Sequence, residues 1–334
     1  MSILDRLAFR AARTRPRRAD PLERLAAAGA AVALAAAANH LVARWSERRH
    51  PPTGRFLTVD GVRLHVVERG EGPAVVLLHG NGAIAEEFAI SGLLDRLAEK
   101  HRVIAIDRPG FGYSARPRRT VWTAANQARL MRKALRQLGV ERPVILGHSW
   151  GTLVALNMAL DDPDKTAALV LLSGYFVPTP RLDVPVFSVT GIPILGDVMR
   201  YTISPLVAWL ISGPLIRRIF SPAPVTMRFA AGFPLALSLR PGQLRASGED
   251  TALMIFDAAR TVHRHAELSV PVHIVAGEGD RIVDTGSQST RLHRDVPDST
   301  LRVVKGVGHM VHHQGQDAVV QAVESAVATS SATA

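Results

Sequence analysis

Short apolar runs alternate with longer mixed segments along most of the chain, and this alternation predicts the fold. The apolar runs have the length and the Val, Ile and Leu content of strands buried on both faces, and they cover 73–78, 102–106, 142–146, 168–172, 270–276 and 301–304. A hairpin, 56–59 and 62–68, precedes them, and helices are predicted over 85–100, 123–138, 285–296 and 316–328. We therefore expect an α/β fold with a mostly parallel, doubly wound sheet.

The alternation stops between residues 175 and 265. This stretch is too long for a simple crossover between two parallel strands, so it predicts an insertion. Its first part is apolar and is interrupted by prolines.

One serine lies between a predicted strand and the helical segment that follows it. Residues 147–151 are Gly-His-Ser-Trp-Gly. A G-x-S-x-G sequence in this setting is typical of the nucleophile elbow, a tight turn that lifts the serine hydroxyl above the sheet edge. Glycines flank the serine because the strained turn leaves no room for side chains beside it. We therefore expect Ser149 to be a nucleophile.

An acid and a histidine follow this serine in the chain order that an elbow nucleophile requires. Asp280 lies in a Gly-rich loop directly after one predicted strand, and His309 lies in the loop after the next. Open α/β sheets place their chemistry at the carboxyl ends of the strands. We expect the three residues to converge there, with His309 as the base and Asp280 holding its imidazole. Asp284 and Glu278 are alternative acids in less favourable positions.

The loop after the strand 73–78 contributes a further part of the predicted site. It has the sequence His-Gly-Asn-Gly, residues 79–82. Enzymes with an elbow nucleophile bind the tetrahedral oxygen through the backbone N–H after the nucleophile and one from this earlier loop. These groups are the N–H of Trp150 and of Asn81, and one such donor is worth about 3 kcal/mol. We expect His79 to brace the loop.

Together these motifs resemble the α/β-hydrolase family, and so does the segment 107–114, Asp-Arg-Pro-Gly-Phe-Gly-Tyr-Ser. The resemblance covers about residues 55–325. It implies the α/β-hydrolase fold, with Asp107 as a structural anchor and with the insertion as a helical cap over the active site. The expected division is a basic N-terminal segment 1–50, a core 51–174 and 266–328, a cap 175–265 and a flexible tail 329–334.

The apolar first part of the cap favours a hydrophobic substrate. Phe187 and Trp209 are the candidate substrate contacts within it. Packing of the cap onto the core accounts for the same pattern equally well. Arg217 and Arg218, beside Trp209, would also let the cap rest on a membrane surface.

The surroundings of the nucleophile are similar to those of the haloalkane dehalogenases, in which an Asn and a Trp at the positions of Asn81 and Trp150 hold the departing halide. Those enzymes have an Asp where this chain has Ser149. An aspartate that displaces halide or opens an epoxide forms an ester, which water can cleave, whereas a serine would form a stable ether. We therefore expect neither dehalogenation nor epoxide hydrolysis.

Acyl transfer is the chemistry that an activated serine supports. We expect an enzyme that hydrolyses a carboxylic ester of a small, fairly hydrophobic molecule through an acyl-enzyme. A lactonase and a C–C bond hydrolase acting on a diketone-like substrate use the same nucleophile and remain open. A non-catalytic binding protein of the same fold is the alternative from another class, disfavoured because all three catalytic candidates are present.

The first 50 residues carry ten arginines against four acidic side chains, which accounts for +6 of the net charge of +11. Residues 25–42 are uncharged and Ala-rich, and at about 18 residues they approach the length of a membrane span. We expect a single N-terminal membrane anchor with its Arg-rich end in the cytoplasm. A cleaved export signal and a soluble helix packed on the core are the alternatives. The absence of cysteine is compatible with any of these compartments.

Cofactor and metal motifs are not apparent in the sequence. His309, His312 and His313 are clustered, but no carboxylate lies at ligand spacing from them, so we expect no metal. No phosphate-binding glycine pattern is present, so we expect no nucleotide cofactor. The N-terminal arginines precede an apolar stretch rather than alternate with aromatic residues, so we expect no nucleic acid partner.

Overall fold

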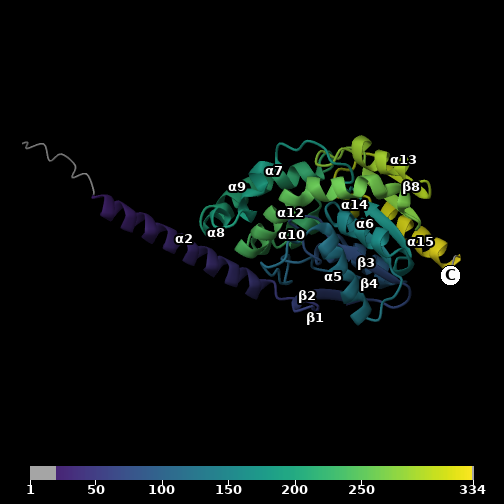
Figure 1. The fold of residues 1–334 in the computed structure, drawn as a ribbon, viewed down its shortest axis with the longest axis horizontal. Helices are drawn as coiled ribbons and strands as arrows, with labels where there is room; N and C mark the ends of the chain where they lie inside the picture. The colour runs from purple at the N-terminus through teal and green to yellow at the C-terminus, as the bar shows by residue number, and fades with distance from the viewer. Residues whose placement is uncertain (1–19, 333–334) are drawn as a thin grey trace, which may run out of the picture.

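A computed structural model describes residues 20–332 of the chain. Figure 1 shows a sheet between two layers of helices, from which one long helix, α2, projects. The strands are β1 (Arg55–Val59), β2 (Val62–Arg69), β3 (Ala74–Leu78), β4 (Arg102–Ile106), β5 (Val144–His148), β6 (Ala168–Leu172), β7 (Val272–Gly277) and β8 (Ser299–Val304).

All eight strands form one sheet in the order β1-β2-β4-β3-β5-β6-β7-β8. β2 is antiparallel to β1 and β4, and the other pairs are parallel, which confirms the predicted mostly parallel α/β sheet. β3 and β5 are neighbours, but the chain leaves β3 towards β4 and leaves β5 towards β6, on opposite sides. Such a switch point opens a crevice at the carboxyl ends of the two strands.

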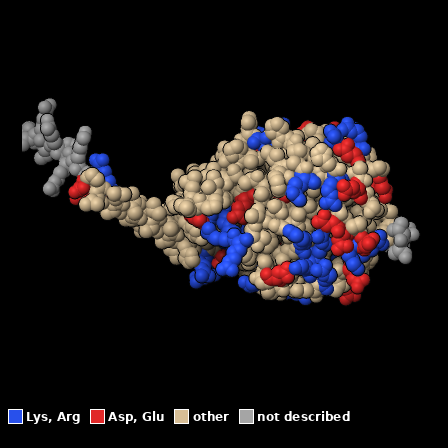
Figure 2. All heavy atoms as spheres, viewed as in Figure 1, with Lys and Arg blue, Asp and Glu red and all other residues tan. Residues whose placement is uncertain are grey.

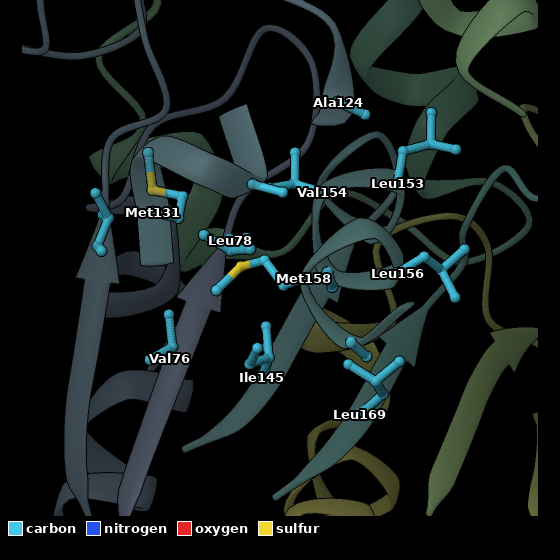
Figure 3. Packing of buried hydrophobic residues seen from close by; sticks show 14 of the residues in the cluster. Val76, Leu78, Ala124, Met131, Ile145, Leu153, Val154, Leu156, Met158 and Leu169 are labelled. Atoms are coloured by element: carbon cyan, nitrogen blue, oxygen red, sulfur yellow. The ribbon is translucent and has the colours of Figure 1, made fainter. Parts of the chain in front are cut away.

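Apolar side chains of one strand point alternately to the two faces of the sheet. Val76 and Leu78 of β3 lie in one buried cluster, and Val75 and Leu77 lie in the other. Figure 3 shows the first cluster, in which strand residues pack against apolar side chains of helix α6 (Gly151–Asp161). Both faces of the sheet are therefore buried away from water. This explains why the strands are uninterrupted apolar runs, without alternation of apolar and polar residues.

Helices cover each face of the sheet. The face covered by α6 also carries α5 (Ala124–Gln137) and α13 (Arg291–Asp295). A π-helical turn, Gly286–Thr290, precedes α13. The other face carries α3 (Glu87–Ser91), α4 (Leu93–Ala98), the short α14 (Val311–Gln314) and α15 (Gln316–Ala332). The helix predicted over 85–100 is in fact two helices, because Gly92 has φ +89° between them. The helix predicted over 123–138 is α5 with its two caps.

Helix α15 continues through Ala332, beyond the end at residue 328 that the sequence predicts for it. Val323 and Ala326 bury one side of this helix, and the Thr329 hydroxyl donates a hydrogen bond to the Ser325 carbonyl. The apolar positions therefore extend the helix beyond the predicted end. Residues 333–334 lie outside the described part of the chain, as do the arginines before residue 20.

The cap segment between β6 and β7 is helical. Its α-helices are α7 (Val184–Phe187), α8 (Leu195–Tyr201), α9 (Ser204–Phe220), α10 (Met227–Gly232), α11 (Leu235–Ser238) and α12 (Pro241–Thr261). It also contains two 3₁₀ turns, Val189–Gly191 and Val262–Glu267. A further 3₁₀ turn, Pro163–Lys165, precedes β6. Helix α12 joins this segment to the core, because its Ala258 lies in the same buried cluster as the sheet residues.

Helix α2 (Pro21–Arg49) is longer than the apolar stretch that predicted it. Asp20 and Glu23 form a capping box at its first turn, and Pro21 occupies the first helical position, as favoured there. Most side chains of the helix are exposed, whereas Ser46 is buried and Asn39, Ala43 and Glu47 are partly buried. Its second half meets the cap segment, where Glu47 pairs with Arg240 at 2.8 Å, and Figures 1 and 2 show the rest projecting from the body with few charged side chains between its ends.

Helix α12 also carries a buried carboxyl group that holds the start of α5. Asp257 is 2% exposed, and its Oδ2 accepts a hydrogen bond of 3.0 Å from the Ala124 N–H. Burial disfavours the ionised form and raises the pKa of Asp257 to about 7.

We predict that Asp257 makes stability fall as the pH rises. The folded-state pKa of about 7 lies above the ordinary value of 3.8, so the protonated form favours folding below pH 4 and this advantage is lost as the pH rises through 7. Asp257→Asn should raise the free energy of unfolding at pH 8, by at most about 4 kcal/mol, and change it little at pH 4. Denaturant unfolding in mild detergent measures this, with the exposed Asp164→Asn as control. An equal effect of Asp257→Asn at both pH values would contradict the prediction.

Candidate active site

The turn between β5 and α6 presents the Ser149 side chain at the edge of the sheet. Ser149 has φ +52°, a conformation that is strained for a residue with a side chain. A Cβ atom on Gly147 would lie 2.8 Å from the Gly151 carbonyl oxygen, and one on Gly151 would lie 2.3 Å from the Leu78 carbonyl oxygen. Glycine is therefore required on both sides of Ser149, as the pattern predicts.

The structure brings Ser149, His309 and Asp280 together. Nε2 of His309 lies 2.9 Å from Oγ of Ser149, and Nδ1 of His309 lies 2.8 Å from Oδ2 of Asp280. The other carboxylate oxygen of Asp280 accepts hydrogen bonds from the N–H groups of Ile282 and Val283. The carboxylate can only accept, so Nδ1 carries the proton and Nε2 is free to accept from the serine hydroxyl.

The two alternative acids have other partners. Oδ1 of Asp284 accepts from the Ser287 N–H, and Oε2 of Glu278 accepts from the Gly306 N–H. Both side chains lie near the exposed surface, where they cap turns.

The loop after β3 lies directly beside the nucleophile. Gly80 is so close that an added Cβ would lie 3.1 Å from the Cβ of Ser149. His79 braces this loop, because its Nδ1 donates to the Gly80 carbonyl and its Nε2 accepts from the Arg108 N–H. Burial, together with the charge of Arg108, lowers the pKa of His79 to about 4, which keeps the ring neutral. No protein acceptor is assigned, within residues 20–332, to the backbone N–H of Asn81 or Trp150.

The side chains of Asn81 and Trp150 do not point to a free halide site. Nδ2 of Asn81 donates to Thr251 Oγ1 at 2.9 Å and to the Ser247 carbonyl at 3.2 Å, both on α12. Nε1 of Trp150 donates to the Asp250 carbonyl, also on α12, at 2.9 Å. The side-chain donors that the likeness to dehalogenases implies are therefore engaged in holding α12.

The chain is similar to known proteins of one family. The family described as alpha/beta hydrolase fold matches residues 73–316. This chain belongs to that family. An uncharacterized protein of Mycobacterium tuberculosis is 30% identical over 284 residues, which cover 82% of this chain and 81% of the relative. The protein is accordingly an α/β-fold hydrolase.

Solved structures share the fold across most of the chain. An esterase from Thermogutta terrifontis superimposes with a TM-score of 0.65 at 21% identity, covering 83% of this chain and 99% of the esterase. An epoxide hydrolase from Vigna radiata gives a TM-score of 0.64 at 22% identity, covering 81% of this chain and 96% of that enzyme. At these identities the likeness concerns the fold, and the two relatives carry out different reactions.

A buried ion pair fixes the loop after β3 in this α/β hydrolase. The Arg108 guanidinium donates to the carbonyl oxygens of His79 and Gly80 at 2.8 and 3.0 Å. Its Nη1 donates to the Asp250 carboxylate at 2.6 Å, and both side chains are 0% exposed. Arg116 donates to the other Asp250 oxygen at 2.9 Å. The Asp250 carboxylate on α12 therefore pairs with two buried guanidinium groups, and Glu249 of the same helix is a second partner of Arg116.

A carboxylate does lie beside the histidine cluster, contrary to the sequence-based expectation. Oε1 of Glu87, on α3, lies 2.9 Å from Nε2 of His312 and 3.5 Å from Nε2 of His313, and all three residues are buried. Burial would raise the pKa of Glu87, but the two histidines outweigh it and hold that pKa well below its usual value. The cluster extends to His148, whose Nε2 donates to the His309 carbonyl at 3.2 Å.

The three side chains of this cluster are of the types that bind zinc, and their ligand atoms lie within 4.8 Å of one another. The hydrogen bond between Glu87 and His312 accounts for their arrangement by itself. Glu87 and His312 are 225 positions apart, so no local sequence pattern reveals this cluster.

The two predicted substrate contacts lie on the outer surface of the cap segment. Phe187 ends α7 and Trp209 lies in α9, and both side chains are exposed. Their contact with substrate stays a prediction.

We predict that Asp250 is essential to stability. Asp250→Ala leaves the buried Arg108 guanidinium without its carboxylate and removes one of the two carboxylates that pair with Arg116, which should lower the free energy of unfolding by about 3–5 kcal/mol. Its neighbour Glu249 pairs with Arg116 and Arg245 nearer the surface, so Glu249→Ala should lower it by about 1 kcal/mol or less. Denaturant unfolding of the detergent-solubilised protein measures both. Similar losses from the two variants would contradict the assignment.

Proposed function

We propose that this α/β hydrolase cleaves a carboxylic ester of a fairly hydrophobic small molecule through an acyl-enzyme on Ser149. The observation that carries the proposal is the hydrogen-bonded series Asp280, His309, Ser149, with distances of 2.8 and 2.9 Å. A nucleophile, a base and the group that orients the base are the parts that acyl transfer requires.

In the proposed reaction Ser149 Oγ attacks the ester carbonyl carbon while its proton passes to Nε2 of His309. The Asp280 carboxylate stabilises the imidazolium that forms and keeps Nδ1 as the donor. The N–H groups of Asn81 and Trp150 then bind the tetrahedral oxyanion. His309 returns the proton to the leaving alcohol, and water attacks the acyl-enzyme with His309 as base.

Apolar side chains around the His309 loop support a hydrophobic substrate. Met310, next to His309, packs in a buried cluster with Phe220 and Phe229. The Ile219 carbonyl, at the end of α9, accepts a hydrogen bond of 3.0 Å from the His309 N–H, so α9 borders the site. An apolar acyl or alcohol group would be desolvated there.

We predict that ester hydrolysis depends on the three residues. With nitrophenyl esters of increasing chain length, Ser149→Ala should lower kcat by at least about 10⁴-fold, and Asp280→Asn by about 10³–10⁴-fold, because the imidazole loses its orienting acceptor. Asp284→Asn, a nearby carboxylate outside the series, is the matched control and should leave kcat unchanged. Octanoate should be cleaved faster than acetate.

Turnover that survives Ser149→Ala would overturn the proposed mechanism, and a preference for acetate would overturn the hydrophobic substrate. Inactivity of the wild-type protein on esters, lactones and diketones alike would favour a binding role.

We further propose that α2 anchors the protein in a membrane, with its Arg-rich end in the cytoplasm. The support is a mean hydropathy of 1.7 over an 18-residue window of α2, none of which is buried against the body. Exposure of so long an apolar helix to water is unfavourable, and a bilayer removes that cost.

The anchor proposal predicts that the protein stays in the membrane pellet after a carbonate wash. The double variant Leu34→Arg and Ala36→Arg places two charges mid-helix, where each costs about 3 kcal/mol, and should move the protein to the supernatant. Leu22→Arg, near the helix start, is the control and should stay in the pellet. Release of the wild-type protein, or a mature protein that lacks α2, would contradict the anchor.

A further inference from the structure

We propose that an apolar face on α8 and α9 docks on the lipid bilayer beside α2, so that the protein contacts the membrane through two separate elements. The inference rests on the proposed anchor and goes beyond it, because it assigns a membrane contact to the body of the enzyme. We call this surface the apolar cap face, and its principal side chains are Ile194, Val198, Ile203, Leu206, Trp209 and Leu210.

These side chains are exposed to an extent that is unusual for large apolar residues. Ile194 is 80% exposed, Leu210 is 61% exposed and Trp209 is 60% exposed. They come from α8, α9 and the residues just before each helix, and the two helices are bent by 69° at the break between them. Together the two helices are long and apolar enough for one bent membrane span. So many exposed large apolar side chains on two adjoining helices mark an interaction site rather than ordinary surface.

Charge is nearly absent from this face. Residues 184–216 contain Asp197 and Arg200 as their charged side chains, and these two pair with each other. Arg118 from the core also pairs with Asp197, at 2.6 Å. In Figure 2 the part of the body above the base of α2 is mostly free of blue and red, whereas a cluster of both charges lies where α2 meets the body and further charges cover much of the rest of that face.

A hydrogen-bonded contact fixes the level at which α2 meets this face. Nδ2 of Asn39 donates to the carbonyl oxygens of Tyr201 and Thr202, at 2.7 and 3.0 Å, at the break between α8 and α9. The part of α2 before Asn39 projects past this contact by about 27 Å, from the rise of an α-helix. That length is close to the hydrocarbon thickness of about 30 Å, so a bilayer that accommodates α2 has its surface at the α8–α9 break.

Aromatic and basic side chains on α8 and α9 are of the types that occur at a membrane surface. Tyr201 and Trp209 have the amphipathic rings that are enriched at membrane–water interfaces. Arg217 and Arg218 follow on α9 and are exposed, where they can meet lipid headgroups. The far end of the same helix contacts the catalytic loop, through Ile219 and His309, so the docked enzyme would hold its site close to the membrane surface.

The absence of cysteine permits a direct test with single fluorescent probes. Leu210→Cys, Leu34→Cys and Val303→Cys, each labelled with an environment-sensitive dye, report on the apolar cap face, on α2 and on the exposed surface of β8 at the far side of the sheet. The full-length protein is reconstituted in vesicles of phosphatidylcholine and phosphatidylglycerol. We expect the emission at 210 to rise about twofold or more with a blue shift, and to be quenched by spin-labelled lipid but not by iodide. The probe at 303 should respond to iodide alone.

Each outcome distinguishes the claims. If spin-labelled lipid quenches the probe at 34 but iodide quenches the probe at 210, the anchor proposal stands and the docking of the apolar cap face is overturned. A probe at 34 open to iodide overturns the anchor itself. Shielding of 210 that rises with protein concentration in detergent, without vesicles, shows a second copy of the chain on this face and overturns the bilayer as its occupant. Ester hydrolysis enters none of these readouts, so failure of the proposed reaction is separate.

Discussion

The buried pair of Arg108 and Asp250 is the interaction on which the candidate site depends. Arg108 holds the carbonyl oxygens of His79 and Gly80, the loop that supplies the proposed oxyanion donor. Asp250 neutralises Arg108 from α12, and its backbone carbonyl accepts from the Trp150 indole. A guanidinium charge in the protein interior is stable only when it is paired with an opposite charge and fully hydrogen-bonded. The pair therefore ties the cap segment, the loop after β3 and the nucleophile turn into one unit.

Much of the fold and the triad geometry could be predicted because they follow local rules. Strands buried on both faces produce uninterrupted apolar runs, and a parallel sheet collects the loops after its strands at one edge. That is why Ser149, Asp280 and His309 could be named from three separate loops. The elbow is equally local, because only glycine fits at 147 and 151.

The rest depends on contacts between distant positions. Arg108 and Asp250 are 142 positions apart, and Glu87 meets His312 across 225 positions, so neither pair leaves a local pattern. Asn81 and Trp150 illustrate a different failure. The motif predicts the role of their backbone N–H groups, but it does not reveal that both side chains donate to α12. The apolar run in the cap was compatible with packing, substrate contact or membrane contact, and only exposure separates these.

The proposed reaction passes through an ester on Ser149, and trapping that intermediate is the decisive experiment. The protein is mixed with a nitrophenyl ester, quenched in acid at early times and digested for mass spectrometry. We expect the acyl group on the peptide that contains Ser149, in an amount that rises during the burst of nitrophenol release. An acyl group on another residue, or full turnover without any covalent adduct, would contradict it.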